Sequence, residues 1–312
     1  MPLQVLNQMG DRVAEMVAER FPEVEVVPVS PSAPPPGVRA DVFFGGYGGW
    51  DTYLPWLEAA GVRWVQLSGT GADGVPAAVF DGRTITCARG ASAGPISEFV
   101  LGAILAFAKR FPDIWLHEPP RHWNFPIPSM DVVEGRTVGI VGLGGIGVAI
   151  AQRASAFGMP VVALRRTNRP SPVAGVRVVQ SLDELLAASD HIVLAAPATP
   201  RTKHLIDREA FAKMKSGAHL VNIARGSLVD QDALRDALDN GLVAMATLDT
   251  VDPEPLPAGH WMYAHPKVRL SAHVSWYTPE ILGRTMELFV ENLGRFIAGE
   301  PLHDVVDPVE GY

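Results

Sequence analysis

The chain has 312 residues, of which 47% are apolar and 19% charged, so it can bury large cores in one or two domains. Its 26 basic and 34 acidic side chains give a net charge of −8, which argues against a surface that neutralises nucleic-acid phosphates. The single cysteine, Cys87, excludes an internal disulfide and favours a reducing compartment.

The first ninety residues alternate between strand-like and helix-like segments, which is typical of a parallel sheet covered by helices. A helix is predicted over residues 11–20, and strands are predicted over residues 3–6, 25–29, 41–44 and 63–67. Residues 31–37 hold four prolines and are interpreted as a stiff loop. Cys87 lies in an apolar stretch, which favours a buried strand residue over a nucleophile.

A helical segment over residues 92–110 leads, through a loop of residues 112–129, to a second α/β unit. Its strands are predicted over residues 137–141, 160–164, 191–195, 219–223, 244–247 and 268–271. A helix from residue 278 to about residue 298 then suggests a return to the first unit. We therefore predict one domain from residues 1–91 and 278–312, a second from residues 92–277, and a ligand site in the cleft between them.

No segment of the sequence predicts insertion into a membrane. Residues 1–12 lack a basic patch followed by an apolar stretch of signal-peptide length. The longest apolar helical run, residues 99–108, is too short to span a bilayer. We expect a cytoplasmic protein.

The segment Gly142-Leu143-Gly144-Gly145-Ile146-Gly147 matches the fingerprint of a dinucleotide-binding turn. A buried strand pattern precedes it and an apolar helix pattern follows it, which is the context that the fingerprint requires. Glycines let the backbone approach a pyrophosphate, and the helix amino terminus attracts its charge. The alternative is a tight turn without a ligand.

The end of the next strand decides which dinucleotide is preferred. An acidic residue there holds the ribose hydroxyls of NAD, whereas an arginine accommodates the extra phosphate of NADP. This chain has Arg165, Arg166 and Thr167 and no carboxylate, so we predict a preference for NADP(H), with NAD(H) as the second option. A solvated basic loop is the alternative interpretation.

The chain resembles the D-isomer-specific 2-hydroxyacid dehydrogenases, which include glyoxylate and hydroxypyruvate reductases. The resemblance covers about residues 60–285 and rests on four groups of residues: Val221 to Asp230, Leu248-Asp249 with Glu254-Pro255, Ala272-His273, and Leu67 to Asp73 with Ser97-Glu98-Phe99. It implies an α/β fold in which a Rossmann cofactor domain is inserted into a smaller, flavodoxin-like substrate domain. It also implies a homodimer, with the loop of residues 112–129 as a candidate contact.

The resemblance also implies the roles of the site residues. Arg225 would bind the substrate carboxylate and polarise its carbonyl, His273 would give the carbonyl oxygen a proton, and Glu254 would hold the imidazole. The carboxylate site would be completed by the backbone of Gly69, Thr70 and Gly71. The implied cofactor contacts are Gly142, Gly144, Gly145, Ile146, Gly147, Arg165, Arg166, Thr167, Pro197, Thr202, Ile223, Ala224, Asp249 and Ser275, and no metal is expected.

Each catalytic candidate alone has a structural interpretation, as a residue before a helix, a turn carboxylate or a histidine at a strand end. Their order and their spacings of 29 and 19 residues favour the catalytic set. The carboxylate of Glu254 favours proton transfer over formate oxidation, because formate dehydrogenases of this superfamily have an amide at that position.

Two features depart from the family pattern: Gly145 stands where many relatives carry a polar or basic residue, and an aromatic pair follows His273. Ser275-Trp276-Tyr277 follows His273, where small residues are frequent, so Trp276, Trp50 and Tyr47 would either shape a substrate pocket or pack between domains. The glycine-rich segment of residues 45–50 either admits substrate or connects strands. Two other functions remain open: a sensor that binds NAD(P)H with little turnover, and a dehydrogenase for another donor such as phosphite.

Overall fold

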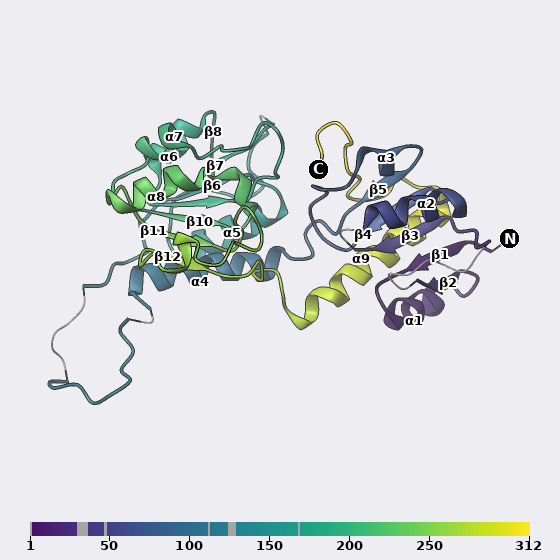
Figure 1. The fold of residues 1–312 in the computed structure, drawn as a ribbon, viewed down its shortest axis with the longest axis horizontal. Helices are drawn as coiled ribbons and strands as arrows, with labels where there is room; N and C mark the ends of the chain where they lie inside the picture. Colours follow the sequence, from purple (N-terminus) through teal and green to yellow (C-terminus); the bar gives the residue numbers. More distant parts are fainter. Residues whose placement is uncertain (1, 30–36, 47–48, 112, 124–128, 168) are drawn as a thin grey trace. The chain divides into compact units, whose positions relative to one another are not determined.

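The computed structural model describes residues 2–29, 37–46, 49–111, 113–123, 129–167 and 169–312. Within it the chain divides into two compact units, residues 1–92 with 278–312 and residues 93–277 (Figure 1). The proline-rich segment 31–36, Tyr47 and residues 112 and 124–128 of the predicted loop lie outside the described residues.

The first unit contains one parallel sheet in the strand order β2-β1-β3-β4-β5. Its strands are β1 (Gln4–Asn7), β2 (Glu25–Pro28), β3 (Val42–Gly45), β4 (Trp64–Leu67) and β5 (Thr84–Thr86). Its helices are α1 (Asp11–Arg20), α2 (Trp50–Ala60), α3 (Ala77–Phe80) and α9 (Pro279–Ala298). This order is that of flavodoxin-like folds, which confirms the predicted fold of this unit.

Alternate strand residues of the first unit face two different helical layers. Phe43 packs with α2 and α3, whereas Phe44 and Trp64 pack with α1 and α9. The ring of Phe289 in α9 stacks on Phe44 at 4.2 Å and on Trp64 at 5.5 Å between centroids. The returning helix α9 therefore completes the core of the unit formed by the first ninety residues.

The second unit contains a larger parallel sheet in the order β12-β11-β10-β9-β6-β7-β8. Its strands are β6 (Val138–Val141), β7 (Val161–Leu164), β8 (Arg177–Val179), β9 (His191–Leu194), β10 (Ala218–Asn222), β11 (Val243–Leu248) and β12 (Val268–Leu270). Its helices are α4 (Ala93–Lys109), α5 (Gly145–Ala156), α6 (Leu182–Ala188), α7 (Arg208–Ala212) and α8 (Gln231–Asp239), with the 3₁₀ turns η1 (Gly226–Leu228) and η2 (Trp261–Tyr263). From β8 to β11 the order is that of a Rossmann fold, which confirms the second predicted fold.

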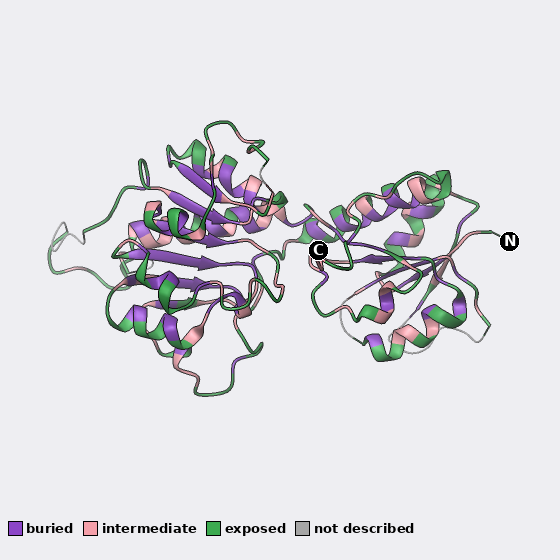
Figure 2. Cartoon of the chain, turned by 90° about the horizontal axis from the view of Figure 1, so that it is seen from above, coloured by how far each residue is buried: buried purple, intermediate pink, exposed green. Residues whose placement is uncertain are grey.

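Helices cover both faces of the second sheet. The helices α4 and α5 pack on one face around Ile140 and Val193, and α6, α7 and α8 pack on the other around Leu194 and Leu220. The inner strands β3, β4, β6, β9 and β10 are buried throughout (Figure 2), whereas the edge strands β2, β8 and β12 are partly exposed. A sheet buried on both faces explains the continuous apolar strand patterns of the sequence.

The loops that follow five neighbouring strands lie at one edge of the second sheet. The residue after each of these strands extends the hydrogen-bond ladder, because its amide donates to a carbonyl of the neighbouring strand. The pairs are Gly142 to Leu164 at 2.9 Å, Ala195 to Val141 at 2.8 Å, Ile223 to Leu194 at 3.4 Å, Asp249 to Asn222 at 2.9 Å and Ser271 to Leu248 at 3.0 Å. Adjacent strands lie about 4.8 Å apart, so these loops are neighbours in space.

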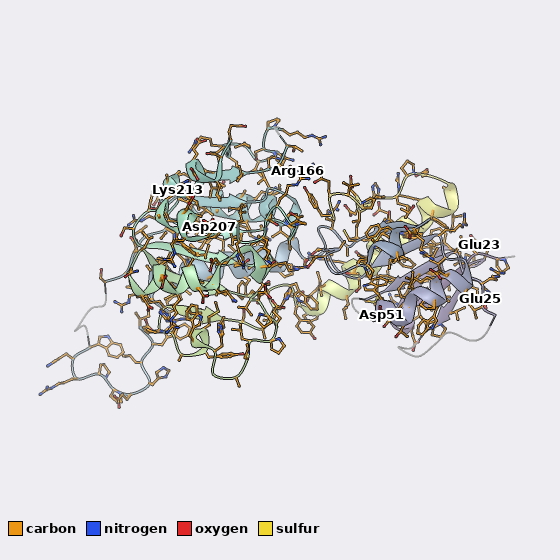
Figure 3. The ribbon with its side chains drawn as sticks, turned by 45° about the horizontal axis from the view of Figure 1, so that its top comes forward. Glu23, Glu25, Asp51, Arg166, Asp207 and Lys213 are labelled. Carbon is orange, nitrogen blue, oxygen red and sulfur yellow. The ribbon has the colours of Figure 1, made fainter. Side chains whose placement is uncertain are left out.

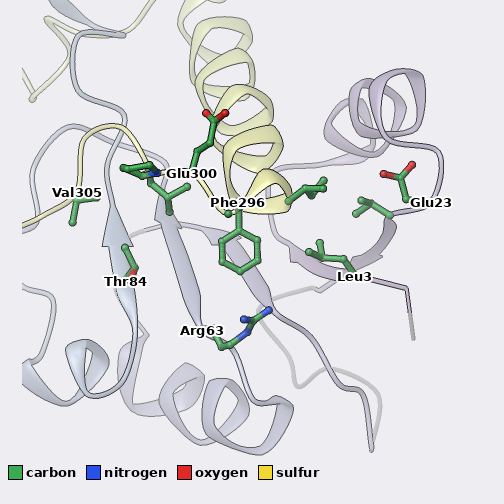
Figure 4. A pocket seen from close by; sticks show the side chains of 12 residues that line it. Leu3, Glu23, Arg63, Thr84, Phe296, Glu300 and Val305 are labelled. Carbon is green, nitrogen blue, oxygen red and sulfur yellow. The ribbon is translucent and has the colours of Figure 1, made fainter.

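A pocket of about 690 Å³ lies on the first unit (Figure 4). Four of the residues that line it, Leu3, Val24, Arg63 and Thr84, precede or begin strands of the parallel sheet. The pocket therefore lies at the amino edge of this sheet, whereas Gly69 to Gly71 follow β4 at the carboxyl edge.

Two local predictions need correction. Cys87 is buried but follows β5 instead of lying in a strand, and burial raises the pKa of its thiol. The end of the glycine-rich segment, Trp50, begins α2 and is 6% exposed within the core of the first unit, so it packs inside one unit, whereas the sequence predicted packing between domains or a place in the substrate pocket. None of the helices in the described parts of the chain combines the length and apolar character needed to cross a bilayer.

Candidate active site

The glycine fingerprint forms the turn between β6 and α5. Gly142 has a φ of 104°, and a Cβ atom there would lie 2.6 Å from the carbonyl oxygen of Ala195. At Gly147 a Cβ atom would lie 2.2 Å from the carbonyl oxygen of Gly142. These two positions require glycine for internal steric reasons.

Gly144 requires a different explanation. It is the N-cap of α5, its φ is −88°, and a Cβ atom there would meet nothing within 4 Å. The protein itself would therefore tolerate a side chain, but a side chain would fill the space in front of the first amides of α5. A helix amino terminus left open in this way suits an anion such as a pyrophosphate. The turn, which also contains Gly145 and Ile146, fits a dinucleotide.

The basic segment lies beside this turn, since the amide of Gly142 donates to the carbonyl of Leu164 at the end of β7. Arg165 Nη1 donates to the carbonyl of Pro170 at 3.3 Å, and Arg166 is exposed (Figure 3). The Thr167 carbonyl accepts a hydrogen bond from the amide of Arg169 at 2.8 Å. The end of the second strand therefore offers cations and a hydroxyl to a ligand.

Arg225 lies in a tight loop after β10 that is shaped by the buried side chain of Asn222. The Oδ1 atom of Asn222 accepts from the amide of Ala224 at 3.0 Å, and its Nδ2 atom donates to the carbonyl of Arg225 at 2.9 Å. Arg225 is half-buried, and its Nη1 donates to the carbonyl of Ala224 at 2.7 Å. Ile223 and Ala224 are buried, so a ligand would meet their backbone.

The next residue, Gly226, packs against the loop that carries Glu254. A Cβ atom at Gly226 would lie 1.9 Å from the carbonyl carbon of Val251. The amide of Val251 donates to Oε1 of Glu254 at 3.1 Å, and the side chain of Gln231 hydrogen-bonds the backbone of Asp252. The loops after β10 and β11 are therefore in direct contact.

His273 meets Glu254, as the sequence predicted. Its Nδ1 atom lies 2.9 Å from Oε2 of Glu254, and the two side chains are 38% and 37% exposed. An ionised carboxylate only accepts hydrogen bonds, so Nδ1 carries the proton and Nε2 is left to exchange a proton with another molecule. This is the arrangement of a histidine held for acid–base chemistry.

Asp249 holds the loop of His273. Its buried carboxylate accepts the hydroxyl of Ser271 at 2.5 Å and the amides of Val274 and Ser275 at 2.9 and 3.0 Å. Its carbonyl accepts the amide of His273 at 2.9 Å. A carboxylate has about four acceptor positions, and three hydrogen bonds to the carboxylate of Asp249 occur here. The cofactor contact that the resemblance implies for Asp249 would use the remaining position.

The remaining predicted residues lie in two places. Thr202 Oγ1 donates to the carbonyl of Pro197 at 2.8 Å in the turn that follows β9, at the same sheet edge as the glycine turn. Gly69, Thr70 and Gly71 lie in the first unit after β4, where the Gly69 carbonyl accepts the amide of Ala88 at 2.7 Å. Among the described residues, no three potential ligand side chains are grouped to hold a metal.

Three residues of the site had no assigned role in the sequence-based prediction, Asn222, Gly226 and Ser271, and Trp276 was predicted only to shape a substrate pocket or to pack between domains. Asn222 and Gly226 stand inside the motif that carries Arg225, but their roles depend on contacts with other loops. The aromatic run after His273 was recognised as unusual, yet only the structure shows that Trp276 Nε1 donates to the carbonyl of His273 at 2.8 Å.

Known proteins resemble this chain in sequence and in fold. The family model for the NAD-binding domain of D-isomer-specific 2-hydroxyacid dehydrogenases matches residues 101–275, more than half of the chain. The chain is 35% identical over 233 residues to a glyoxylate reductase of Thermofilum pendens, covering 72% of this chain and 68% of the relative.

Other relatives differ in length and in named substrate. The chain is 32% identical over 255 residues to a D-3-phosphoglycerate dehydrogenase of Methanocaldococcus jannaschii, covering 80% of this chain and 48% of that relative, so it spans about half of its length. The structure of a D-isomer-specific 2-hydroxyacid dehydrogenase of Xanthobacter autotrophicus with NADPH and MES is 26% identical, with a TM-score of 0.81 and coverage of 100% and 99% of the two chains. This chain therefore belongs to the D-isomer-specific 2-hydroxyacid dehydrogenase family.

Proposed function

We propose that this protein is an NADP(H)-dependent reductase of small 2-keto acids such as glyoxylate or hydroxypyruvate. The observation that carries the proposal is the 2.9 Å contact between His273 and Glu254, in loops at the same sheet edge as the glycine turn. Residues 93–277 would bind the cofactor, and residues 1–92 with 278–312 would contribute to substrate binding. The bound cofactor supplies the hydride that reduces the keto group.

The side chains of the second unit have complementary roles in this reaction. The guanidinium of Arg225 is always charged and planar, so it suits the carboxylate and carbonyl of a 2-keto acid. Nε2 of His273 donates a proton to the carbonyl oxygen as that oxygen becomes a hydroxyl. Glu254 accepts from Nδ1, which fixes the ring and offsets the positive charge of the protonated imidazole.

The backbone of Gly69, Thr70 and Gly71 would complete the binding of the substrate carboxylate. Backbone amides in a glycine-rich loop after a parallel strand provide such an anion site. The loop follows β4 at the carboxyl edge of the flavodoxin-like sheet, which is the usual ligand edge of this fold.

The preference for NADP(H) rests on the end of β7. Arg165 and Arg166 are cations and Thr167 is a hydroxyl donor, and the segment has no carboxylate to hold a free ribose hydroxyl. The Xanthobacter relative, which contains NADPH, supports this choice. We expect NAD(H) to bind more weakly, since it lacks the phosphate that the arginines would pair with.

The proposed substrate class rests on the named relatives. A glyoxylate reductase at 35% identity favours a small keto acid, although a phosphoglycerate dehydrogenase also resembles the chain. The direct test is a panel of glyoxylate, hydroxypyruvate, pyruvate and a phosphorylated keto acid, each with NADPH and with NADH. The proposal predicts turnover of a small keto acid and a higher kcat/KM with NADPH.

The same panel, extended to phosphite with NADP+ and with NAD+, separates two other functions. Tight NADPH binding without turnover would identify a sensor of the cofactor, and oxidation of phosphite in the reverse direction would identify a dehydrogenase for another donor. A clear advantage for NADH would reject the cofactor preference alone.

We also propose a homodimer that uses the loop after α4. Among the described residues of the segment 112–129, Trp115, Leu116 and Trp123 are 58%, 60% and 80% exposed. Large apolar side chains that a folded protein exposes near one another favour an interface. Light scattering after gel filtration tests this, and a monomer at micromolar concentration would contradict it.

A further inference from the structure

The backbone of His273 adopts the left-handed conformation, with a φ of 55°. Residues with a side chain rarely occupy this region, and they stay there only where surrounding contacts hold them. The direction of the imidazole follows from this backbone. The contacts that hold the backbone of His273 therefore also decide whether Nδ1 reaches Glu254 at 2.9 Å.

The amide side of this loop is held by Asp249. The amide of His273 donates to the backbone carbonyl of Asp249, and the carboxylate accepts the amides of Val274 and Ser275. Ser271 lies two positions before His273, and its hydroxyl donates to the same carboxylate at 2.5 Å. Asp249 thus fixes the chain immediately before and after the histidine.

The carbonyl side is held by Trp276. Its Nε1 donates to the carbonyl oxygen of His273 at 2.8 Å. The amide of Tyr277 donates to the carbonyl of Val274 at 2.9 Å, which closes the turn that returns Trp276 to His273. The rings of Trp276 and Tyr277 also meet edge to face, 5.4 Å apart at 89°.

We propose that Trp276 is a positioning residue for His273. Its indole N–H, acting with Asp249, keeps the His273 backbone in the left-handed conformation that directs Nδ1 to Glu254 and leaves Nε2 for the substrate. Trp276 acts through the histidine and is assigned no contact with the substrate. The kinetic part of this inference rests on the proposed reductase function.

Two changes remove the indole N–H. Trp276→Phe keeps an aromatic ring, and replacement of Trp276 by benzothienylalanine keeps the fused ring but has sulfur in place of N–H. A single hydrogen bond has a modest net effect, so we expect kcat for keto-acid reduction to fall about three- to tenfold in both. We expect KM for NADPH to stay within about twofold, because Trp276 is assigned no contact with the cofactor.

A second measurement does not depend on turnover. Nitrogen NMR of the histidine rings, with His273 assigned from a His273→Gln sample, reports whether Nδ1 keeps its proton and its bond to Glu254. We expect one tautomer in the wild type and a mixture in the two Trp276 variants. Tyr277→Phe is the matched control, because Tyr277 is 65% exposed and the change leaves the Trp276 bond intact.

The outcomes separate the two proposals. Wild-type ring signals in both Trp276 variants would overturn the positioning role, as would a loss of kcat that follows only a lower Tm. Altered ring signals in a protein that reduces no keto acid would support the positioning of His273 and reject the reductase function.

Discussion

His273 and Glu254 lie 2.9 Å apart, Nδ1 to Oε2, although one follows β12 and the other follows β11. The two strands are parallel neighbours, with Leu248 opposite Leu270, so their carboxyl ends bring the two loops together. The strand register therefore brings an imidazole to a carboxylate 19 residues away in the chain. This pair makes acid–base chemistry available at the same sheet edge as the glycine turn.

Replacement of the histidine should affect the chemical step. We expect His273→Gln to lower kcat by about 10²- to 10⁴-fold and to change the KM for NADPH little, because the proton donor is lost while the glycine turn is intact. His265→Gln is the matched control, since His265 also faces a carboxylate, Asp239, at 3.2 Å, on a different part of the same unit. Near-normal kcat in His273→Gln on the true substrate would contradict the acid–base role.

The cofactor preference should depend on charge at the end of β7. We expect Arg166→Gln to raise the KM for NADPH about tenfold or more and to leave that for NADH nearly unchanged, because only NADPH has the extra phosphate. Arg177→Gln is the control. Arg177 lies in the neighbouring strand β8, and its exposed side chain pairs with Glu184. Equal effects of Arg166→Gln on the KM for both cofactors would show that this arginine does not bind the extra phosphate of NADPH.

The contact between Gly226 and Val251 should be intolerant of a side chain. We expect Gly226→Ala to lower Tm and kcat together, because a Cβ atom 1.9 Å from the Val251 carbonyl carbon must displace the loops of Arg225 and Glu254. Gly102→Ala is the control with the opposite expectation. Gly102 lies within α4, and an added Cβ atom there would meet nothing within 4 Å. This substitution should stabilise the protein by about 0.5–1 kcal/mol, because alanine favours a helix more than glycine does. Thermal unfolding of the two variants, with kcat, checks both; a Gly226→Ala protein with normal activity would refute the argument.

Stability should fall on mild acidification because of two buried histidines. Burial lowers the pKa of His191 to about 4 and lowers the pKa of His219 well below its usual value; their Nδ1 atoms lie 3.4 Å apart. In the unfolded chain both rings titrate near pH 6.5, so between about pH 6.5 and pH 4 the unfolded state binds more protons. Stability is therefore fully present above pH 6.5 and declines below it.

The loss attributable to His191 is on the order of 3 kcal/mol by pH 4. Unfolding in urea at pH 7 and pH 5 measures the slope. We expect His191→Gln to flatten it, whereas His303→Gln, at an exposed position of the first unit, should leave it unchanged. An identical slope in His191→Gln would show that other groups govern the acid sensitivity.

Much of the fold could be predicted because local patterns and tertiary structure agree. The helix predicted over residues 11–20 is observed as Asp11–Arg20, and most predicted strands differ from the observed ones by one residue at an end. The short edge strands β5 and β8 and the helices α2, α3, α6, α7 and α8 were not assigned. Three-residue edge strands have little periodicity, and α2 begins at Trp50 beside glycines and contains Pro55, which both disfavour a helix.

The sequence names a set of candidate site residues, but it does not show the contacts that hold them in place. Arg225, Glu254 and His273 stand in motifs that a single sequence displays. The roles of Asp249, Gly226 and Trp276 come from hydrogen bonds and close packing between loops that follow different strands. Such contacts depend on strand order and register, which neighbouring residues in the sequence do not encode.

The most direct test of the central claim is transfer of deuterium from NADPH labelled at C4 of the nicotinamide to a 2-keto acid, followed by mass spectrometry of the product. We predict a 2-hydroxy acid that carries one deuterium on C2 with the wild-type protein, and formation slowed at least about 100-fold with His273→Gln. Binding of NADPH without deuterium transfer to any keto acid of the panel would contradict the account.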